Sequence, residues 1–528
     1  MHVTLICTDD DNWAIGMRSI SSALKQAGHS TRIILTCSGN GVLNARGLEN
    51  IRSLSRPSDI VGISSMSRSS RKAKALIEAL KSLGKPIVWG GMHPTVCPED
   101  CVGYADLICR GEGEEFMVEL TELLSKGKDY LNIQNGGNKK NDQVILNDVR
   151  PVVADMDSLP FVDFSFSDEF NVDERGKVYP NISMKQSLSI LFSGSRGCAF
   201  NCHYCSNARI KTLYAGKSPF VRKMSILNFV ESARKCREIF PQAKYFYFTD
   251  EDFFARRVDE FKEFAEVYPK KVGLPFECMA SPQQITDEKM TILVKAGLWR
   301  VDMGVESGSD RVKKEVFNRK ASNDIVIKSA AILSRYPHVV VYYFFIIGNP
   351  YENSEDLLGT VGLIKRLPFP AFIRTYNLVF MPGTQLFEKA LQDGMISGLE
   401  DGGFQMDFAA GFDYRNHAWK RNNLYLNGLI SLMTGKSTRR RIGFIPRAVL
   451  SVLIRPRLVD FNNRHKIFSE AIIGLARGEI RLRRKALSMA SRIFKDPISV
   501  RTLKGITKKI LSNKSNGKAI ETSCHNRQ

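Results

Sequence analysis

Short apolar runs alternate with amphipathic stretches along the first 110 residues. The runs have the length of buried strands, and the stretches between them have the spacing of helices, with Gly28 and Gly84 placed to end the helices at 15–27 and 71–83. Alternating strands and helices predict βαβ units and a doubly wound α/β domain whose parallel sheet binds ligands at the carboxyl ends of its strands. The predicted strands are 3–7, 31–35, 60–64, 86–89 and 105–109.

A second series of alternating elements begins at residue 188. Six apolar runs are each followed by a stretch with helical spacing, which predicts a partial barrel, a (β/α)6 version of the eight-stranded fold. In that architecture chemistry takes place at the carboxyl ends of the strands. The predicted strands are 188–192, 245–249, 275–279, 300–305, 339–347 and 374–380.

These patterns divide the chain into five segments. Residues 1–130 form the first α/β domain, 131–187 a linker, 188–400 the barrel, 401–512 a basic helical region and 513–528 a disordered tail. The amino-terminal sequence has no basic segment followed by an apolar run, so no signal peptide is predicted. The longest apolar stretch, 339–347, is too short to span a bilayer. Scattered cysteines favour a reducing, cytoplasmic location over a disulfide framework.

Charge is concentrated at the carboxyl end. The chain carries a net charge of +21, and residues 436–528 hold 23 of its 76 Lys and Arg but 5 of its 55 Asp and Glu. Basic amphipathic segments there predict peripheral contact with an anionic membrane surface, and a helical cap with a solvated basic face remains the alternative. No nucleic-acid partner is expected, because no recognition motif or aromatic interleaving accompanies the charge.

Three cysteines define the candidate chemistry. Cys198, Cys202 and Cys205 follow the predicted strand 188–192 with the spacing C-x3-C-x2-C. Thiolates are ligands for iron–sulfur clusters and for zinc. Three cysteines leave one iron of a cubane cluster without a protein ligand, whereas zinc would need a fourth ligand, for which His203 lies within the loop.

The cysteine loop resembles the signature of radical S-adenosylmethionine (radical SAM) enzymes, including the aromatic Tyr204 before the third cysteine. The resemblance implies a [4Fe-4S] cluster whose open iron binds S-adenosylmethionine. It also implies cleavage of the sulfonium to a 5′-deoxyadenosyl radical and an electron donor of the flavodoxin or ferredoxin type. Further residues at strand ends match family positions that contact S-adenosylmethionine: Asp250, Glu251, Glu306, Ser307 and Arg319.

The first domain resembles the cobalamin-binding domain of class B radical SAM enzymes. The resemblance rests on three loops at strand ends and implies that they bind cobalamin: Ser64, Ser65 and Met66; Gly90, Gly91, His93 and Thr95; and Gly111, Glu112 and Gly113. The Asp-x-His-x-x-Gly motif of mutase-type domains is absent, since the corresponding stretch is Thr8–Trp13. Histidine ligation of cobalt is therefore not expected, and His93 is expected to structure its loop or contact the cobalamin tail.

The two resemblances together predict a cobalamin-dependent radical SAM enzyme. They imply methyl transfer to an unactivated carbon of a small-molecule or lipid-like substrate, with one S-adenosylmethionine supplying the methyl group and a second the radical. Two alternatives remain open. One is oxidative cyclisation or rearrangement without methyl transfer, and the other is a non-catalytic cobalamin or redox sensor.

Overall fold

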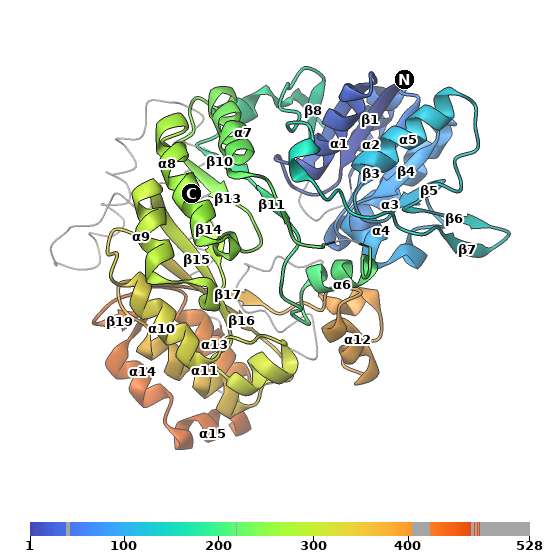
Figure 1. Ribbon diagram of the computed structural model, residues 1–528. Coiled ribbons are helices and arrows are strands. Elements are labelled where there is room, and N and C mark those ends of the chain that lie inside the picture. Colours follow the sequence, from blue (N-terminus) through green and yellow to red (C-terminus); the bar gives the residue numbers. More distant parts are fainter. Residues whose placement is uncertain are drawn as a thin grey trace.

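The computed structural model describes residues 1–37, 43–217, 219–403 and 423–465, together with residues 469, 472, 473 and 475. The predicted tail 513–528 and most of the basic segment after residue 465 lie outside these residues. Two large sheets, each covered by helices, stand side by side, as Figure 1 shows. The predicted fold class is confirmed.

The first domain is a parallel sheet with helices on both faces. Its central strands have the order β5-β4-β3-β1-β2, and the side chains of β1 alternate between two cores. Val3 and Leu5 pack against α1 and α5, whereas Ile6 packs toward α2 and α3. The elements are β1 (His2–Cys7), α1 (Ile15–Gln26), β2 (Ser30–Cys37), α2 (Ala45–Ser55), β3 (Ile60–Ser64), α3 (Ser70–Leu80), β4 (Ile87–Gly90), α4 (Met92–Val96), β5 (Leu107–Cys109) and α5 (Glu114–Ser125).

The predicted linker 131–187 contributes four strands to this first sheet. A hairpin of β6 and β7 pairs with β5 at one edge, and β8 pairs in parallel with β2 at the other, followed by β9. A buried ion pair between Arg18 of α1 and Glu169 of β8 fixes the second edge. The first domain therefore extends beyond residue 130. The strands are β6 (Gly136–Lys140), β7 (Gln143–Leu146), β8 (Glu169–Asp173) and β9 (Val178–Pro180).

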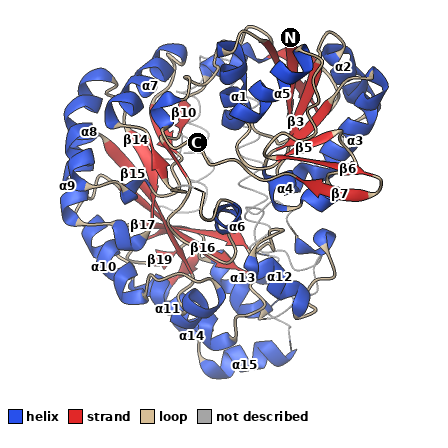
Figure 2. Ribbon diagram, turned by 45° about the vertical axis from the view of Figure 1, so that its right-hand side comes forward, coloured by secondary structure: helices blue, strands red, loops and turns tan. Residues whose placement is uncertain are grey.

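The second sheet contains the six parallel strands expected of the partial barrel. One face of each strand packs on the outer helices, and the other faces the concave side, which is visible in Figure 2 between α6 and the strands. The strands are β10 (Ser189–Phe192), β13 (Tyr245–Phe248), β14 (Phe276–Ala280), β15 (Leu298–Glu306), β16 (Val340–Ile347) and β17 (Ala371–Asn377). The helices are α6 (Ser206–Leu213), α7 (Ile226–Ile239), α8 (Val258–Lys271), α9 (Asp287–Ala296), α10 (Asn323–Leu333), α11 (Ser354–Arg366) and α12 (Gln385–Gln392).

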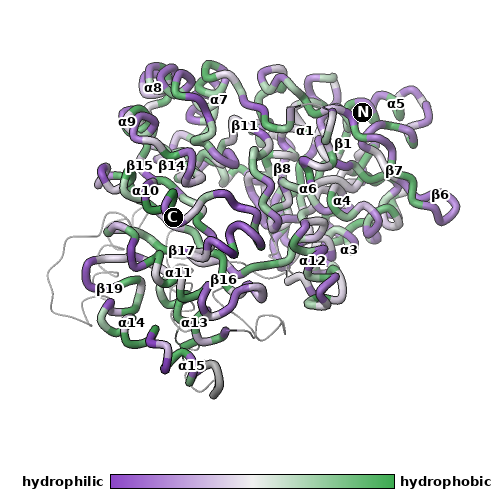
Figure 3. Tube along the Cα trace, turned by 60° about the horizontal axis from the view of Figure 1, so that its bottom comes forward, coloured by the Kyte–Doolittle hydropathy of each residue, from purple (hydrophilic) through white to green (hydrophobic). Residues whose placement is uncertain are grey.

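The carboxyl-terminal region continues the second sheet. Three short antiparallel strands extend it beyond β17, and α13 packs against α11 and β16. Figure 3 shows hydrophobic stretches along α13 and α14. No helix in the described ranges has the length and apolar character that a bilayer crossing requires. The elements are α13 (Leu424–Leu432), β18 (Gly435–Ser437), β19 (Arg441–Ile442), β20 (Ile445–Pro446), α14 (Arg447–Leu453) and α15 (Pro456–His465).

Candidate functional site

The glycine-containing loops of the first domain form one connected surface. Gly91 has a φ of 95°, and a Cβ at this position would lie 2.6 Å from Ser64 Oγ, so the ends of β3 and β4 can approach only because the residue is glycine. The Thr95 hydroxyl donates to the Gly91 carbonyl at 2.7 Å and accepts from Gly111 N–H at 2.9 Å. Thr95 therefore ties the loop after β4 to the loop after β5.

The loop after β3 is held from both sides. Trp89 Nε1 donates to Ser65 Oγ at 2.9 Å, and the buried carboxylate of Asp9 accepts from Met66 N–H at 3.1 Å. Met66 itself leaves 39% of its surface exposed at this edge of the sheet. Most of the polar groups of these loops are bonded within the chain, and Met66 presents an exposed apolar side chain at their edge.

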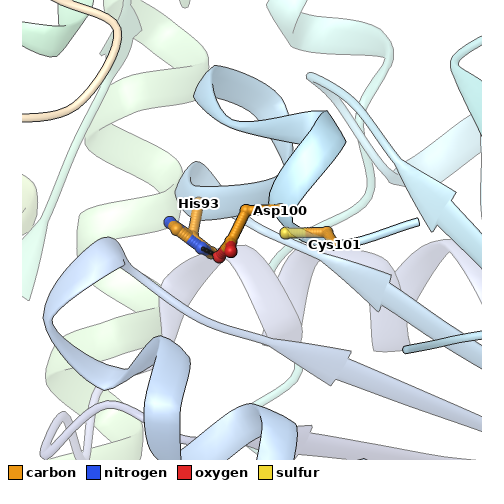
Figure 4. A group of neighbouring side chains, drawn as sticks. All are labelled: His93, Asp100 and Cys101. Carbon is orange, nitrogen blue, oxygen red and sulfur yellow. Dashed lines mark hydrogen bonds and ion pairs between the residues drawn. The ribbon is translucent and has the colours of Figure 1, made fainter. Parts of the chain in front are cut away.

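His93 is a structural part of this surface. Its ring is buried, with Nδ1 at 3.1 Å from Ser67 Oγ and Nε2 at 2.9 Å from Asp100 Oδ2, as Figure 4 shows for Asp100. Cys101 lies beside the pair, and the ligand atoms of the three residues fall within 4.8 Å of one another. The ammonium of Lys74 already sits 2.8 Å from Asp100 Oδ1. Both ring nitrogens are thus engaged within the chain, as a loop-structuring residue requires.

Four charged residues join the first domain to the strand that leads into the cysteine loop. We call Glu112, Glu114, Arg196 and Arg222 the interdomain clasp. Arg196 Nη1 lies 3.1 Å from Glu112 and Nη2 lies 2.5 Å from Glu114, while Arg222 Nη2 lies 2.9 Å from Glu112. Burial opposes the charge of Glu112, but hydrogen bonds from Arg222 and the charge of Arg196 hold its pKa below the usual value. The Glu112 carboxylate therefore serves the clasp.

The helix after the cysteine loop packs against the same domain. Glu112 N–H donates to Tyr214 Oη at 2.9 Å, and a Cβ at Gly111 would lie 1.8 Å from that oxygen. In addition, α6 contacts α4, the helix that carries His93 and Thr95. Figure 1 shows α6 between the two sheets. The cysteine loop is thus bounded by domain contacts on both sides, at Arg196 before it and at Tyr214 after it.

The cysteine loop lies against the end of β15. Arg319 Nη1 is 3.8 Å from Cys202 Sγ and 3.1 Å from Tyr204 Oη, and its Nη2 donates to the Gly304 carbonyl at 2.8 Å. Glu306 lies 3.7 Å from the same guanidinium. The structure therefore brings together Cys202, Tyr204, Glu306 and Arg319, which the sequence analysis singled out separately.

The cysteine spacing fits a cluster better than a single zinc ion. Three cysteines suffice for a [4Fe-4S] cluster with one open iron, whereas a tetrahedral zinc ion needs a fourth protein ligand. The ring of His203 is directed to the Val316 carbonyl, 3.2 Å from Nδ1. Burial raises the pKa of Cys198 to about 11 and that of Cys205 to about 12. A bound metal would have to supply the charge that favours their thiolates.

The acidic residues at the end of β13 point in different directions. Asp250 is buried, and its carboxylate accepts from Gly194 N–H at 3.2 Å and from Ser195 Oγ at 2.5 Å. It therefore shapes the turn that precedes the cysteines. Glu251 is exposed, and its charge contributes to the raised pKa of Cys198. The next residue, Asp252, has one buried carboxylate oxygen without a hydrogen-bond partner in the described residues.

The end of β15 is held in an unusual conformation. Glu306 has a φ of 71°, a left-handed conformation that a non-glycine residue adopts at a cost of about 1–3 kcal/mol. Ser307 follows and donates to Glu352 Oε1 at 3.0 Å, while Glu352 Oε2 is buried without a hydrogen-bond partner in the described residues. The turn directs the Glu306 carboxylate toward Arg319 and the cysteine loop. The unpaired oxygens of Asp252 and Glu352 are the kind of groups that a bound polar ligand would satisfy.

We expect Glu352 to give the stability of the protein a specific pH dependence. Burial raises its pKa from 4.5 to about 8. Between these values the folded protein keeps a proton that the unfolded chain releases, so the free energy of unfolding falls as pH rises through this window. The predicted loss between pH 6 and pH 8 is about 2 kcal/mol. Urea unfolding of wild type and Glu352→Gln at both pH values measures it.

The glutamine variant has no carboxyl at this position to titrate. Its free energy of unfolding should therefore fall by about 2 kcal/mol less than that of wild type between pH 6 and pH 8. Glu388→Gln, which changes an exposed carboxyl of α12, provides the control and should follow wild type. Equal pH dependence in wild type and Glu352→Gln would contradict the assignment of a protonated Glu352.

Four contributors to this region were missed in the sequence analysis. Charge complementarity could have suggested the clasp, since Arg196 stands two residues before Cys198 and Glu112 lies in a loop already singled out. No local pattern identifies the others, because their roles depend on contacts across elements. The missed residues are Arg196, Tyr214, Arg222 and Glu352.

Two family models match the chain. Residues 192–364 match the radical SAM superfamily, and residues 1–121 match the B12 binding domain. The first match lies within the barrel, and the second lies within the first α/β domain. They cover the cysteine loop, Glu306 and Arg319 in one case and the three loops after β3, β4 and β5 in the other.

The chain is similar to methyltransferases and to a cyclase. An uncharacterized methyltransferase, PH0819, of Pyrococcus horikoshii is 26% identical over 64% of this chain and 70% of its own length. The anaerobic magnesium-protoporphyrin IX monomethyl ester cyclase of Rubrivivax gelatinosus is 25% identical over 66% of this chain and 60% of its own. The solved structure of the radical SAM methyltransferase TsrM from Kitasatospora setae, with cobalamin and a [4Fe-4S] cluster bound, has a TM-score of 0.60 at 16% identity, covering 75% of this chain and 78% of that one. The chain belongs to the cobalamin-binding radical SAM enzymes.

Proposed function

We propose that the protein transfers a methyl group from S-adenosylmethionine to an unactivated carbon of a small molecule. The observation that carries this proposal is the interdomain clasp. It connects the loop after β5, where the B12 binding domain would hold its cofactor, to Arg196, two residues before the first cluster cysteine. Such a connection suits an enzyme that must hold two cofactors in one fixed relation.

The chain provides positions and polar groups for this chemistry. When bound, the cluster would supply the electron that cleaves S-adenosylmethionine, and cobalamin would carry the methyl group. Cys198, Cys202 and Cys205 would hold the cluster. Glu306 and Arg319 are placed to orient S-adenosylmethionine, with the cation suited to a carboxylate and the carboxylate to hydroxyl groups. The loops containing Ser65, Gly91 and Gly111 would cradle cobalamin.

Anaerobic reconstitution tests the proposed function. The protein is loaded with iron, sulfide and cobalamin, then given S-adenosylmethionine and an electron donor of the flavodoxin type. Methyl transfer predicts that S-adenosylhomocysteine and 5′-deoxyadenosine accumulate together in the presence of substrate extracts. Formation of 5′-deoxyadenosine without S-adenosylhomocysteine would exclude methyl transfer. Absence of both products from the fully loaded protein would favour a sensor.

Oxidative cyclisation is the second candidate function. It is favoured by the similarity to the Rubrivivax cyclase, whose coverage of this chain equals that of the methyltransferase within a few per cent. The same experiment separates the two candidates, because cyclisation consumes S-adenosylmethionine without producing S-adenosylhomocysteine.

We also propose that the carboxyl-terminal region contacts an anionic membrane. Two valines on α14, Val449 and Val452, each expose 47% of their surface. The exposed arginines around them could bind lipid headgroups while the valines enter the interface. These arginines are Arg439, Arg440, Arg441, Arg455 and Arg457.

Liposome co-sedimentation checks the membrane proposal. Wild type should bind vesicles that contain about 30% phosphatidylserine. Added salt should release it, because salt screens the attraction between the arginines and the anionic headgroups. Val449→Asp combined with Val452→Asp should reduce vesicle binding about tenfold or more. The double change removes the apolar surface that enters the lipid interface and adds negative charge that anionic headgroups repel. Binding that is unchanged in this variant would remove α14 from the contact.

A further inference from the structure

The concave face of the barrel sheet carries a row of partly exposed aromatic rings. Along β16, Val341 and Tyr343 are buried against the outer helices, whereas Tyr342, Phe344 and Ile346 alternate on the opposite face and are half-buried. On the neighbouring strand β17, Phe372 stacks on Tyr342 at 4.8 Å, and Tyr376 packs edge-on against Phe344 at 5.4 Å. A flat apolar molecule could pack against these rings.

Arg300 and two acidic residues form a complete network beneath the rings. Arg300 Nε and Nη2 each lie 2.8 Å from one carboxylate oxygen of Asp302, and Nη1 lies 3.1 Å from Glu277. The three side chains are buried on β14 and β15. Asp302 therefore already has its bidentate partner, and the network has no need of a second arginine.

Arg374 of β17 supplies a second guanidinium on this face. Its guanidinium carbon lies 4.7 Å from the ring centre of Tyr342, which also has Arg300 at 4.2 Å. Among the described residues, Arg374 makes no hydrogen bond and no ion pair, and it is half-buried. An arginine presents five donors, so most of its hydrogen-bonding capacity is available to a ligand.

The charge balance on this face also favours an anion. Burial raises the pKa of Glu277 to about 7 despite the nearby Arg300, so this carboxyl is only partly ionised at neutral pH. Asp302 is fully paired with Arg300, and burial opposes the charge of Glu277. Arg374 therefore presents a cation in a partly desolvated position, where a charge-assisted pair with an anion is strong.

We infer that Arg374, with the rings of Tyr342, Phe344 and Tyr376, binds the oxyanion of an aromatic substrate. The class is a carboxylate or phosphate attached to a flat, largely apolar ring system. This inference rests on the proposed function, because it assigns the substrate of the same barrel. Arg374 makes no contact with the cysteine loop or the cobalamin loops among the described residues, so the inference does not follow from the cofactor assignment.

Strand register places this group at the level of the candidate active site. Arg374 pairs with Phe344, and Phe344 pairs with Gly304, whose carbonyl accepts from Arg319 beside Cys202. Arg374 is therefore two strands away from Gly304, roughly 10 Å across the sheet. A substrate anchored there would extend its ring system toward the cysteine loop.

Binding of matched naphthalene probes tests the inference without requiring turnover. Isothermal titration of the cluster- and cobalamin-loaded protein compares 1-naphthoate, 1-naphthyl phosphate and the neutral 1-naphthamide. We expect the wild type to bind at least one anionic probe about tenfold to a hundredfold more tightly than the amide, the range for one charge-assisted interaction. Tighter binding of the carboxylate or of the phosphate identifies which oxyanion the site prefers.

Two variants assign the preference to Arg374. Arg374→Gln should remove the discrimination between anion and amide, whereas Arg374→Lys should retain part of it. Arg335→Gln, which changes an exposed arginine of a surface ion pair, should behave as wild type. If loaded wild type forms no 5′-deoxyadenosine, that result counts against the proposed function. The binding result does not depend on it. Equal affinities for anion and amide in wild type, no binding of either anion, or unchanged discrimination in Arg374→Gln, would each overturn the inference.

Discussion

Replacement of Cys202 by alanine should abolish both the cluster and the cleavage of S-adenosylmethionine. Cys202 is buried in the centre of the loop and lies 3.8 Å from Arg319, so its loss removes a ligand from the most enclosed corner of the site. A cluster with two remaining cysteines has two irons without protein ligands. We expect the iron content of reconstituted protein to fall from about four per chain to near zero. Formation of 5′-deoxyadenosine should fall below detection.

Cys37→Ala provides the matched control, because Cys37 is a half-buried cysteine at the end of β2 in the first domain. This variant should keep its iron, its visible absorption and its product formation. Retention of four irons and activity in Cys202→Ala would require another ligand set and would contradict the cofactor assignment. Loss of iron in both variants would indicate a general folding defect instead.

Replacement of Arg196 by glutamine should separate methyl transfer from S-adenosylmethionine cleavage. The change leaves Glu114 without its cation and leaves Glu112 with Arg222 alone. The cysteine loop itself keeps all of its ligands, so 5′-deoxyadenosine formation should remain within a few fold of wild type. Methyl transfer needs the two domains in register, and a displacement of about 1 Å can reduce such a rate about a hundredfold. The ratio of S-adenosylhomocysteine to 5′-deoxyadenosine measures the effect.

A spectroscopic readout accompanies this ratio. Magnetic coupling between Co(II) and the reduced cluster, recorded by EPR, should weaken or become heterogeneous in Arg196→Gln. Arg150→Gln is the control, since Arg150 pairs with Glu119 of α5 within the first domain and lies outside the clasp. An unchanged ratio and unchanged coupling in Arg196→Gln would show that the clasp does not position the domains. A parallel loss of both products would point to a defect in the cysteine loop.

The main elements of the fold could be predicted from the sequence because they bury apolar faces. The helix predicted at 15–27 is observed at Ile15–Gln26, and the strand predicted at 339–347 is observed at Val340–Ile347. The edge strands of the first sheet escaped prediction. Strand β6 has the sequence Gly-Gly-Asn-Lys-Lys and no alternation of apolar residues, so its pairing with β5 depends on tertiary context.

The candidate site was predictable only at the level of loops. The cysteine spacing and the loop containing Glu306 are local patterns, and the structure brings them together through Arg319. The direction of a side chain is not a local property. Asp250 and Glu112 occupy strand-end positions that suggested ligand contacts, yet each carboxylate is bound by the chain itself. The sequence cannot reveal this, because the groups that bind these carboxylates come from distant segments.

The placement of β8 has a consequence for biosynthesis. This strand covers the edge of β2, and its residues, Glu169–Asp173, follow the B12 binding match by about fifty positions along the chain. The first sheet can therefore be completed only after the ribosome has released residues 131–187, which precede the barrel in the sequence. A fragment cut at residue 130 would expose the edge of β2 and leave Arg18 buried without Glu169. The cobalamin-binding half can be produced as a separate protein only if it extends past β9, to about residue 187.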